Sequence, residues 1–161
     1  MRIESREPAV AAAGPLSTEP GSFGRAAAWL SKQVELALVG TELSLPQYRV
    51  LGVLAEGASI PSALAERLTV RRPTVTAVVD GLEARGLVQR TPGDLDKRSV
   101  THTLTAKGER LLGKANSAVD SRLTDIAACL DDAALIEQAL SSLELWRVAM
   151  RAYHRAQAAR T

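Results

Sequence analysis

The sequence predicts a mainly α-helical protein with one small two-stranded β hairpin, the wing, near the middle of the chain. Hydrophobic residues make up 46% of the 161 residues but aromatic residues only 3%, so the core is expected to be aliphatic and rich in alanine, which favours helices. Apolar residues recur at helical spacing through most of the chain after residue 21. Between residues 87 and 105 the spacing changes to the alternation typical of strands.

The bulk composition limits the possible classes of function. This length suits one compact domain, or a small domain with additional interaction helices. The formal net charge of +2 permits a nucleic-acid partner without requiring one, so the placement of the charges has to decide. The single cysteine, Cys129, excludes an internal disulfide and favours a reducing, cytoplasmic setting. No apolar run is long enough for a signal peptide or a membrane span, so we expect no membrane partner.

The N-terminal third is expected to contain a tail, two helices and a short strand. Residues 1–21 are rich in Pro, Gly, Ala and Ser without a period, which predicts a flexible tail. We expect Ser22 to cap a helix that Gly40 ends. Residues 43–57 predict a second helix, and residues 58–60 a short strand.

A short helix over residues 61–68, a turn at Thr69 and Val70, and a longer helix over residues 71–86 are predicted next. One face of the longer helix is apolar at helical spacing, and we expect it to pack against the helices before it. Gly86 is the expected stop. The apolar residues are Val75, Val78, Val79 and Leu82.

The hairpin is predicted from two alternating segments, residues 87–92 and 99–105, joined by the charged turn 93–98. Two long amphipathic helices follow, the first capped by Thr105 and the second by Asp131 or Asp132. A short helix, a tight turn, a second helix and a hairpin are typical, in this order, of a winged helix-turn-helix. That architecture reads DNA.

The exposed face of the second helix in this motif, the recognition helix, is small and shallow. A helix enters the major groove only if its leading side chains are not bulky, and hydroxyl, methyl and guanidinium groups can each contact base edges or phosphates. A solvated helix face made of ordinary small residues is the alternative. The predicted DNA-contacting residues are Arg71, Arg72, Pro73, Thr74, Thr76, Ala77 and Asp80, of which Asp80 can either accept from a cytosine amino group or hold a nearby arginine.

The turn of the hairpin projects Lys97 and Arg98 beside Asp96. An arginine at such a tip can enter the minor groove, where the electrostatic potential is most negative. A soluble charged turn is the alternative. Behind a helix-turn-helix at this spacing, we predict that these three residues contact DNA.

These segments resemble the MarR family of bacterial transcription regulators. The resemblance runs from about Ser22 to Tyr153 and rests on four pieces in order: LSLPQYRVLGVLAEG, LAERL, TVTAVVDGLEARGLVQR and DKRSVTHTLTAKG. The last matches the D-x-R wing motif and the L-T-x-x-G that follows it. The sequence departs from the family where Ala77 and Gly81 replace common basic residues. It also departs where Thr69 replaces a turn glycine and where Arg71 replaces a capping serine or threonine.

The resemblance implies a homodimer on a pseudo-palindromic operator in double-stranded DNA. It divides the chain into a helical dimerisation region, residues 22–42 and 106–157, and a DNA-binding domain, residues 43–105. Long apolar stripes support association, because they exceed what one small winged domain needs to cover. Packing of these helices within one chain is the alternative. The predicted dimerisation residues are Leu112, Ile136, Leu140 and Leu143.

The resemblance also implies a repressor that a small, often phenolic or aromatic, ligand releases by a population shift. Trp29, Tyr48 and Arg49 are candidates to line the ligand cleft, or else they are ordinary core and surface residues. Cys129 lies outside the first helix, where some members of the family sense oxidants, and it is expected to be a small buried hydrophobe. A cysteine-based redox sensor is therefore the lesser alternative.

No catalytic, metal-binding or cofactor motif is found, so an enzyme is not predicted. His102 and His154 stand alone, without metal-ligand spacing, and packing or a phosphate contact would explain His102. A winged module that binds protein instead of DNA remains an alternative. The operator, the regulated genes, the effector and the direction of regulation are not predicted.

Overall fold

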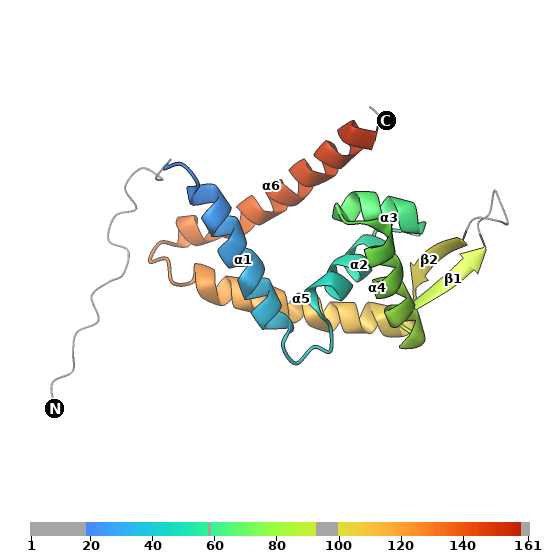
Figure 1. Ribbon diagram of the computed structural model, residues 1–161. Coiled ribbons are helices and arrows are strands. Elements are labelled where there is room, and N and C mark those ends of the chain that lie inside the picture. Colours follow the sequence, from blue (N-terminus) through green and yellow to red (C-terminus); the bar gives the residue numbers. More distant parts are fainter. Residues whose placement is uncertain (1–18, 58, 93–99, 159–161) are drawn as a thin grey trace. The chain divides into compact units, whose positions relative to one another are not determined.

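The computed structural model describes residues 19–57, 59–92 and 100–158 (Figure 1). The chain divides into two compact units. One, here called the winged unit, spans Glu35–Val119, and the other, the helical unit, combines Met1–Val34 with Asp120–Thr161. Six helices and a two-stranded sheet are found in the described residues, which confirms the predicted fold class. The predicted tail lies largely outside those residues.

The winged unit contains the helix-turn-helix. Helices α2 (Leu45–Ala55), α3 (Pro61–Leu68) and α4 (Arg72–Ala84) contact one another pairwise (Figure 1). The predicted helix over residues 61–68 is confirmed, and the one predicted over 71–86 is shorter by a residue or two at each end. Their aliphatic side chains form the core, and the largest fully buried ones are Val50, Leu51, Leu64, Val75, Val79, Leu82, Leu87 and Val88.

Helix α2 is shorter than the predicted helix over residues 43–57 because a capping box sets its start. The Ser44 side chain accepts a hydrogen bond from the Gln47 backbone N–H, and the Gln47 side chain accepts one from the Ser44 backbone N–H. This reciprocal pair satisfies two donors that the first helical turn leaves without partners. The S-x-x-Q spacing of Ser44 and Gln47 encodes this capping box.

The wing consists of β1 (Val88–Pro92) and β2 (Val100–Leu104), which pair antiparallel with Val88 opposite Leu104. The short strand predicted over residues 58–60 is reduced to one bridge, in which Ser59 and His102 exchange backbone hydrogen bonds of 3.1 and 2.8 Å. The pairing cannot extend into α3, because that helix begins at Pro61, which has no N–H to donate.

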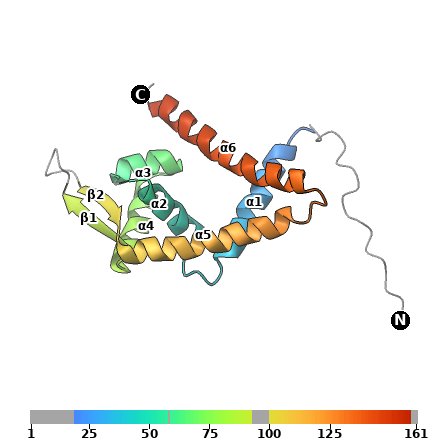
Figure 2. The ribbon, with the colours of Figure 1, turned by 180° about the vertical axis from the view of Figure 1, so that it is seen from behind.

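The helical unit contains most of α1 (Ser22–Leu38), the end of α5 (Ala106–Ala127) and α6 (Ala133–Ala158), seen from behind in Figure 2. Ser22 is the first helical residue and not the predicted cap, because the Gly21 carbonyl accepts the first helical hydrogen bond, from Arg25 N–H. Asp132 caps α6, accepting hydrogen bonds of 2.7 and 3.2 Å from the backbone N–H groups of the second and third helical residues. One of the two capping alternatives is therefore confirmed.

Cys129 is exposed, so its predicted burial is wrong. The residue lies in the turn after α5, beyond the point where the buried stripe of that helix ends, and its Sγ lies 3.7 Å from the Asp125 carbonyl oxygen. No helix in the described part of the chain is long and apolar enough to cross a membrane.

Candidate nucleic-acid interface

The turn between α3 and α4 keeps a left-handed conformation without a glycine. Thr69 has φ 55° and ψ 45°. The backbone N–H of Thr69 donates to the Glu66 carbonyl, and that of Val70 donates to the Ala65 carbonyl, at 3.1 and 3.0 Å. This pair of hydrogen bonds closes the end of a helix and normally has glycine at the left-handed position. Thr69, in place of the usual turn glycine, therefore leaves the turn geometry intact but makes the backbone more strained than a glycine would.

Helix α4 begins without a side-chain cap. Arg71 is its N-cap residue in extended conformation, and the Arg71 carbonyl accepts hydrogen bonds from the backbone N–H groups of Thr74 and Val75 at 3.0 and 3.3 Å. Arg71, in place of the usual capping serine or threonine, thus leaves the start of the helix unchanged. Arg71 and Arg72 are both exposed at this positive end of the helix dipole, which suits an anionic partner such as phosphate.

The two faces of α4 differ as predicted. Val75, Val79 and Leu82 are at most 2% exposed and Val78 is half-buried. The Thr76 hydroxyl donates to the Arg72 carbonyl at 3.1 Å, so its lone pairs are still able to accept. All seven residues predicted to contact DNA are exposed, namely Arg71, Arg72, Pro73, Thr74, Thr76, Ala77 and Asp80.

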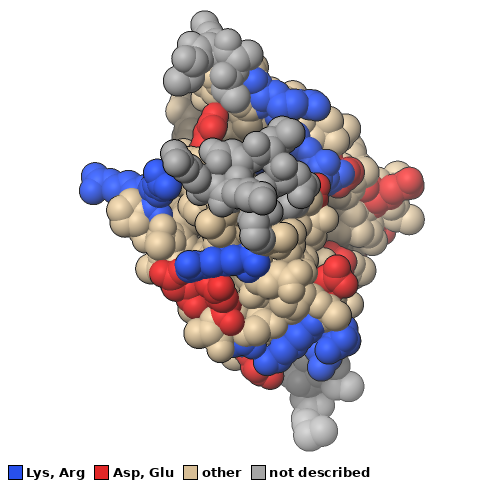
Figure 3. All heavy atoms as spheres, turned by 90° about the vertical axis from the view of Figure 1, so that its right-hand side faces the viewer, with Lys and Arg blue, Asp and Glu red and all other residues tan. Residues whose placement is uncertain are grey.

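Charged groups do not form a continuous basic belt on the face shown in Figure 3. Lys and Arg side chains are separated there by uncharged surface and by Asp and Glu. This distribution agrees with the small net charge of the chain. Attraction to DNA would therefore depend on individual cations at the helix start and in the wing, and less on a general field.

Asp80 joins the recognition helix to the wing. Its Oδ1 lies 2.5 Å from Nη2 of Arg90 on β1, and the Arg90 Nε lies 2.8 Å from Oε2 of Glu83. Asp80 thus has the second of its two predicted roles, holding an arginine. Because all three side chains are at least one-third exposed, the ion pairs add little stability, but they orient the strand against the helix.

The end of α4 is joined to the wing and to α5 by a compact junction. Gly86 has φ 67°, and the backbone N–H of Leu87 donates to the Leu82 carbonyl at 2.9 Å. The Thr105 hydroxyl donates to the Gly86 carbonyl at 2.7 Å and accepts from Gly108 N–H at 3.1 Å, so Thr105 caps α5 as predicted.

Gly108 completes this junction by its lack of a side chain. A Cβ at this position would overlap the backbone carbonyl oxygen of Leu87. The L-T-x-x-G segment, Leu104 to Gly108, therefore contains a cap at its threonine and a site of close backbone approach at its glycine. Sequence reasoning used the motif only as a family signature and missed this physical role.

His102 is the one histidine of the winged unit, and it is only 3% exposed. Its Nδ1 has no hydrogen-bond partner among the described residues. Burial lowers the pKa of this imidazole, with a smaller effect in the same direction from the cation of Arg90, while a backbone hydrogen bond with Ser59 opposes the shift. Packing and a phosphate contact are the two explanations predicted for His102. Its burial agrees with packing and not with a phosphate contact.

The other predicted site residues are scattered. Asp96, Lys97 and Arg98 lie outside the described residues. The Arg49 guanidinium donates to the Leu68 carbonyl at 2.9 Å and so stabilises the end of α3, and the Tyr48 hydroxyl donates to Asn116 Oδ1 at 2.9 Å. Trp29 is 70% exposed. Arg49 and Tyr48 thus both make contacts within the fold, which their prediction as ligand-cleft residues did not include.

The predicted dimerisation residues fall into two groups. Ile136, Leu140 and Leu143 are half-buried on α6. Leu112 is only 6% exposed within the winged unit, where it is a core residue of one chain. This burial does not fit an intermolecular role. The sequence could not show this, because periodicity alone does not distinguish a stripe covered by its own chain from one covered by a partner.

No group of His, Cys, Asp and Glu in the described ranges suits a metal ion.

The turn, the recognition helix and the antiparallel wing together define a winged helix-turn-helix protein. The sequence profile of the MarR family matches residues 41–99. Over 103 residues the chain is 36% identical to the HTH-type transcriptional regulator Mb0904 of Mycobacterium bovis, covering 63% of this chain and 72% of the relative. The chain belongs to the MarR family of transcriptional regulators.

Several solved structures share this fold at 27–28% identity. The transcriptional repressor CouR bound to a 23-mer DNA duplex matches with a TM-score of 0.64 and 28% identity, over 78% of this chain and 89% of that chain. NadR in complex with 4-hydroxyphenylacetate matches with a TM-score of 0.64 and 27% identity, over 88% of this chain and 98% of that chain. Both support the winged helix-turn-helix assignment.

Proposed function

We propose that this regulator binds a pseudo-palindromic operator as a homodimer and represses transcription until a small ligand releases it. The single observation that supports DNA reading most strongly is the exposed face of α4. All seven predicted contact residues are exposed there, while the apolar residues of the opposite face are buried or half-buried. The first turns of such a helix, with their threonines and arginines, can approach base edges in the major groove.

The uncovered apolar surface of the helical unit supports the proposed domain roles. Residues 22–42 and 106–157 form the dimerisation region, and residues 43–105 form the DNA-binding domain. Helix α6 has no buried residue in its described part, yet Ile136, Leu140 and Leu143 lie along it. A second copy of the chain is the proposed cover, because an apolar helix face of this length is unfavourable in water.

Regulation by a ligand is proposed from the related structures. CouR is a repressor that has been solved on DNA, and NadR has been solved with a phenolic acid. A ligand that binds better to a dimer whose recognition helices are wrongly spaced for consecutive grooves would lower the population of the DNA-binding state. Relatives bearing these names are regulators, and we propose no enzymatic activity for this chain.

The test is fluorescence anisotropy of the full chain on DNA from upstream of its own gene, with scrambled DNA as control, across a salt series. Tight, sequence-dependent binding with a steep salt slope is expected. Arg72→Gln should weaken binding and reduce the salt slope by about one counterion, since one phosphate contact is lost. Arg155→Gln, which removes a cation from the last turn of α6, is the matched control and should leave both unchanged.

Salt dependence also separates this function from that of a protein-binding winged module. If the chain binds neither probe, binding selection on genomic fragments gives the second test, since the operator can lie away from the gene. Failure to enrich any fragment would contradict DNA reading and favour a protein partner.

A further inference from the structure

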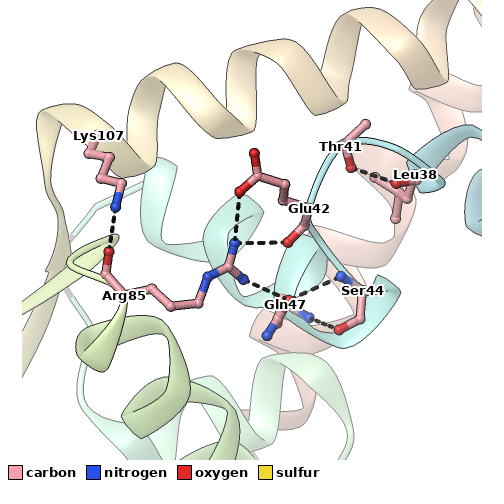
Figure 4. A network of polar contacts seen from close by, with 7 residues as sticks. All are labelled: Leu38, Thr41, Glu42, Ser44, Gln47, Arg85 and Lys107. Atoms are coloured by element: carbon pink, nitrogen blue, oxygen red, sulfur yellow. Dashed lines mark hydrogen bonds and ion pairs between the residues drawn. The ribbon is translucent and has the colours of Figure 1, made fainter.

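The winged unit contains a basic hollow of about 460 Å³ at the end of the recognition helix opposite Arg71. It is lined by the C-terminal end of α4, by one face of α5 and by Glu42 from the segment before α2. Figure 4 shows two of its cations, Arg85 and Lys107, with the polar groups that hold them. The lining residues are Glu42, Ala84, Arg85, Leu87, Lys107, Arg110, Leu111 and Lys114.

The charge of this hollow is far from the average of the chain. Four of its lining side chains are cationic and one is a carboxylate, which gives a formal charge of +3, whereas the whole chain has +2. Lys107, Arg110 and Lys114 follow the i, i+3, i+7 spacing and so share one face of α5. Like charges on one face repel one another, so this arrangement is unfavourable unless an anion compensates it.

Two of the four cations are held in place by the protein. The Arg85 guanidinium donates to the Glu42 carbonyl at 2.9 Å and to Gln47 Oε1 at 3.3 Å, and it lies 3.8 Å from the Glu42 carboxylate (Figure 4). The Lys107 ammonium donates to the Arg85 carbonyl at 2.8 Å. These contacts fix the positions of two charges before any ligand arrives, which lowers the entropy cost of binding.

The other two cations have no such role. Arg110 and Lys114 are exposed, and neither has a hydrogen-bond or ion-pair partner among the residues that the structure describes. Their charges therefore contribute nothing to holding the fold together. Between the cations lie three apolar side chains, those of Ala84, Leu87 and Leu111.

We propose that this hollow binds a small organic anion with at least two negative charges on an apolar body. Several cations around an apolar patch match carboxylate or phosphate groups on a carbon skeleton. The volume is in the range of small-molecule sites. The site is distinct from the recognition face. Any effect of the bound anion on DNA affinity rests on the proposed function, and it would reach α4 through the contact between Lys107 and the Arg85 carbonyl.

The test is isothermal titration calorimetry of the full chain without DNA, at constant ionic strength. The probe is phthalate, an aromatic dianion, and benzoate is the matched monoanion. Phthalate should bind once per chain. Benzoate should bind about fivefold more weakly, because it lacks one exposed ion pair of about 1 kcal/mol. Arg110→Gln and Lys114→Gln should each weaken phthalate by about fivefold and the double variant by about 25-fold. Arg155→Gln should have no effect.

Because Arg110 and Lys114 hold no part of the fold, the thermal midpoint of the double variant should not fall. Phthalate binding that the double variant leaves unchanged would overturn the proposal, and so would no binding at millimolar phthalate and pyrophosphate. If neither anion binds but the double variant reduces the salt slope of DNA binding, the hollow contacts the phosphate backbone of DNA and is not a ligand site. A failure of DNA binding would leave the calorimetry unaffected.

Discussion

The winged unit and the helical unit differ in how they bury apolar side chains. Of the seventeen buried hydrophobic residues in the described part of the chain, sixteen lie in the winged unit, where they form a core, and eight of these, from α2 to β1, have fully buried side chains. In the described part of the helical unit only Ala127 is buried, while Phe23, Trp29, Leu145 and Trp146 are each more than 60% exposed. Both units have amphipathic helices, but only the winged unit covers its apolar faces with its own residues.

This difference shows that helical periodicity has two distinct outcomes in one chain. Leu112 and Leu140 lie on stripes with the same spacing, yet Leu112 belongs to the core of the winged unit and Leu140 remains half-buried on α6. An apolar stripe that stays open favours association, since burial of each aliphatic side chain stabilises by about 1.5–3 kcal/mol. The helical unit is therefore expected to depend on a partner and the winged unit to be stable by its own packing.

The largest expected effect is on association. Leu140→Asp should abolish the proposed dimer, because a carboxylate buried without a partner costs about 3–5 kcal/mol. Sedimentation velocity should show a monomer. The winged unit of this monomer should keep its fold. Gln138→Asp, on the opposite side of α6, is the matched control and should still sediment as a dimer. A dimeric Leu140→Asp variant would contradict the role of α6.

The next effect concerns the junction inside the winged unit. Gly108→Ala should destabilise this unit by about 3 kcal/mol, at the upper end of overpacking costs, because the new Cβ overlaps the Leu87 carbonyl. Gly113→Ala on the same helix meets no atom within 4 Å and should stabilise by about 0.5–1 kcal/mol, the helical preference for alanine over glycine. Urea denaturation followed by circular dichroism measures both, and equal effects would contradict the close approach.

A third prediction concerns pH. Burial lowers the pKa of His102 in the folded state, so below about pH 6.5 the unfolded chain binds more protons than the folded one. The free energy of unfolding should therefore fall with falling pH between about 6.5 and 5, by at most about 1.4 kcal/mol per pH unit.

The two histidines lie in different units, which makes the pH effect assignable. His102→Leu should flatten the pH dependence, whereas His154→Leu, in the helical unit, should retain it. Denaturation curves at several pH values provide the measurement. A slope that survives His102→Leu would show that other groups cause it.

The smallest expected effect is at the turn before the recognition helix. Thr69→Gly should stabilise the winged unit by about 0.5–1 kcal/mol, because glycine accepts a left-handed conformation without the steric cost that threonine incurs there. Thr74→Gly, within α4, should have the opposite sign. The thermal midpoint measures both. A Thr69→Gly variant that is no more stable than the original chain would mean that the left-handed turn is not strained.

Local features were the most predictable from the sequence. The helix over residues 61–68, the caps at Thr105 and Asp132 and the buried side of α4 depend on residues within a few positions of one another. The short strand predicted before α3 is reduced to a single bridge, and the predicted burial of Cys129 is wrong. Each depends on where a segment stops, at Pro61 in one case and beyond the buried stripe of α5 in the other.

The sequence by itself thus determined the order of the helices, the wing and the small exposed face of the recognition helix. Spacing and capping chemistry act over one or two turns, so they can be read along the chain. Only the tertiary structure decided that Gly108 meets the Leu87 carbonyl, that Asp80 holds Arg90, and that the basic hollow forms beside Arg85. The physical reason is that these groups come from different elements, and their contacts depend on how those elements pack, which no local pattern encodes.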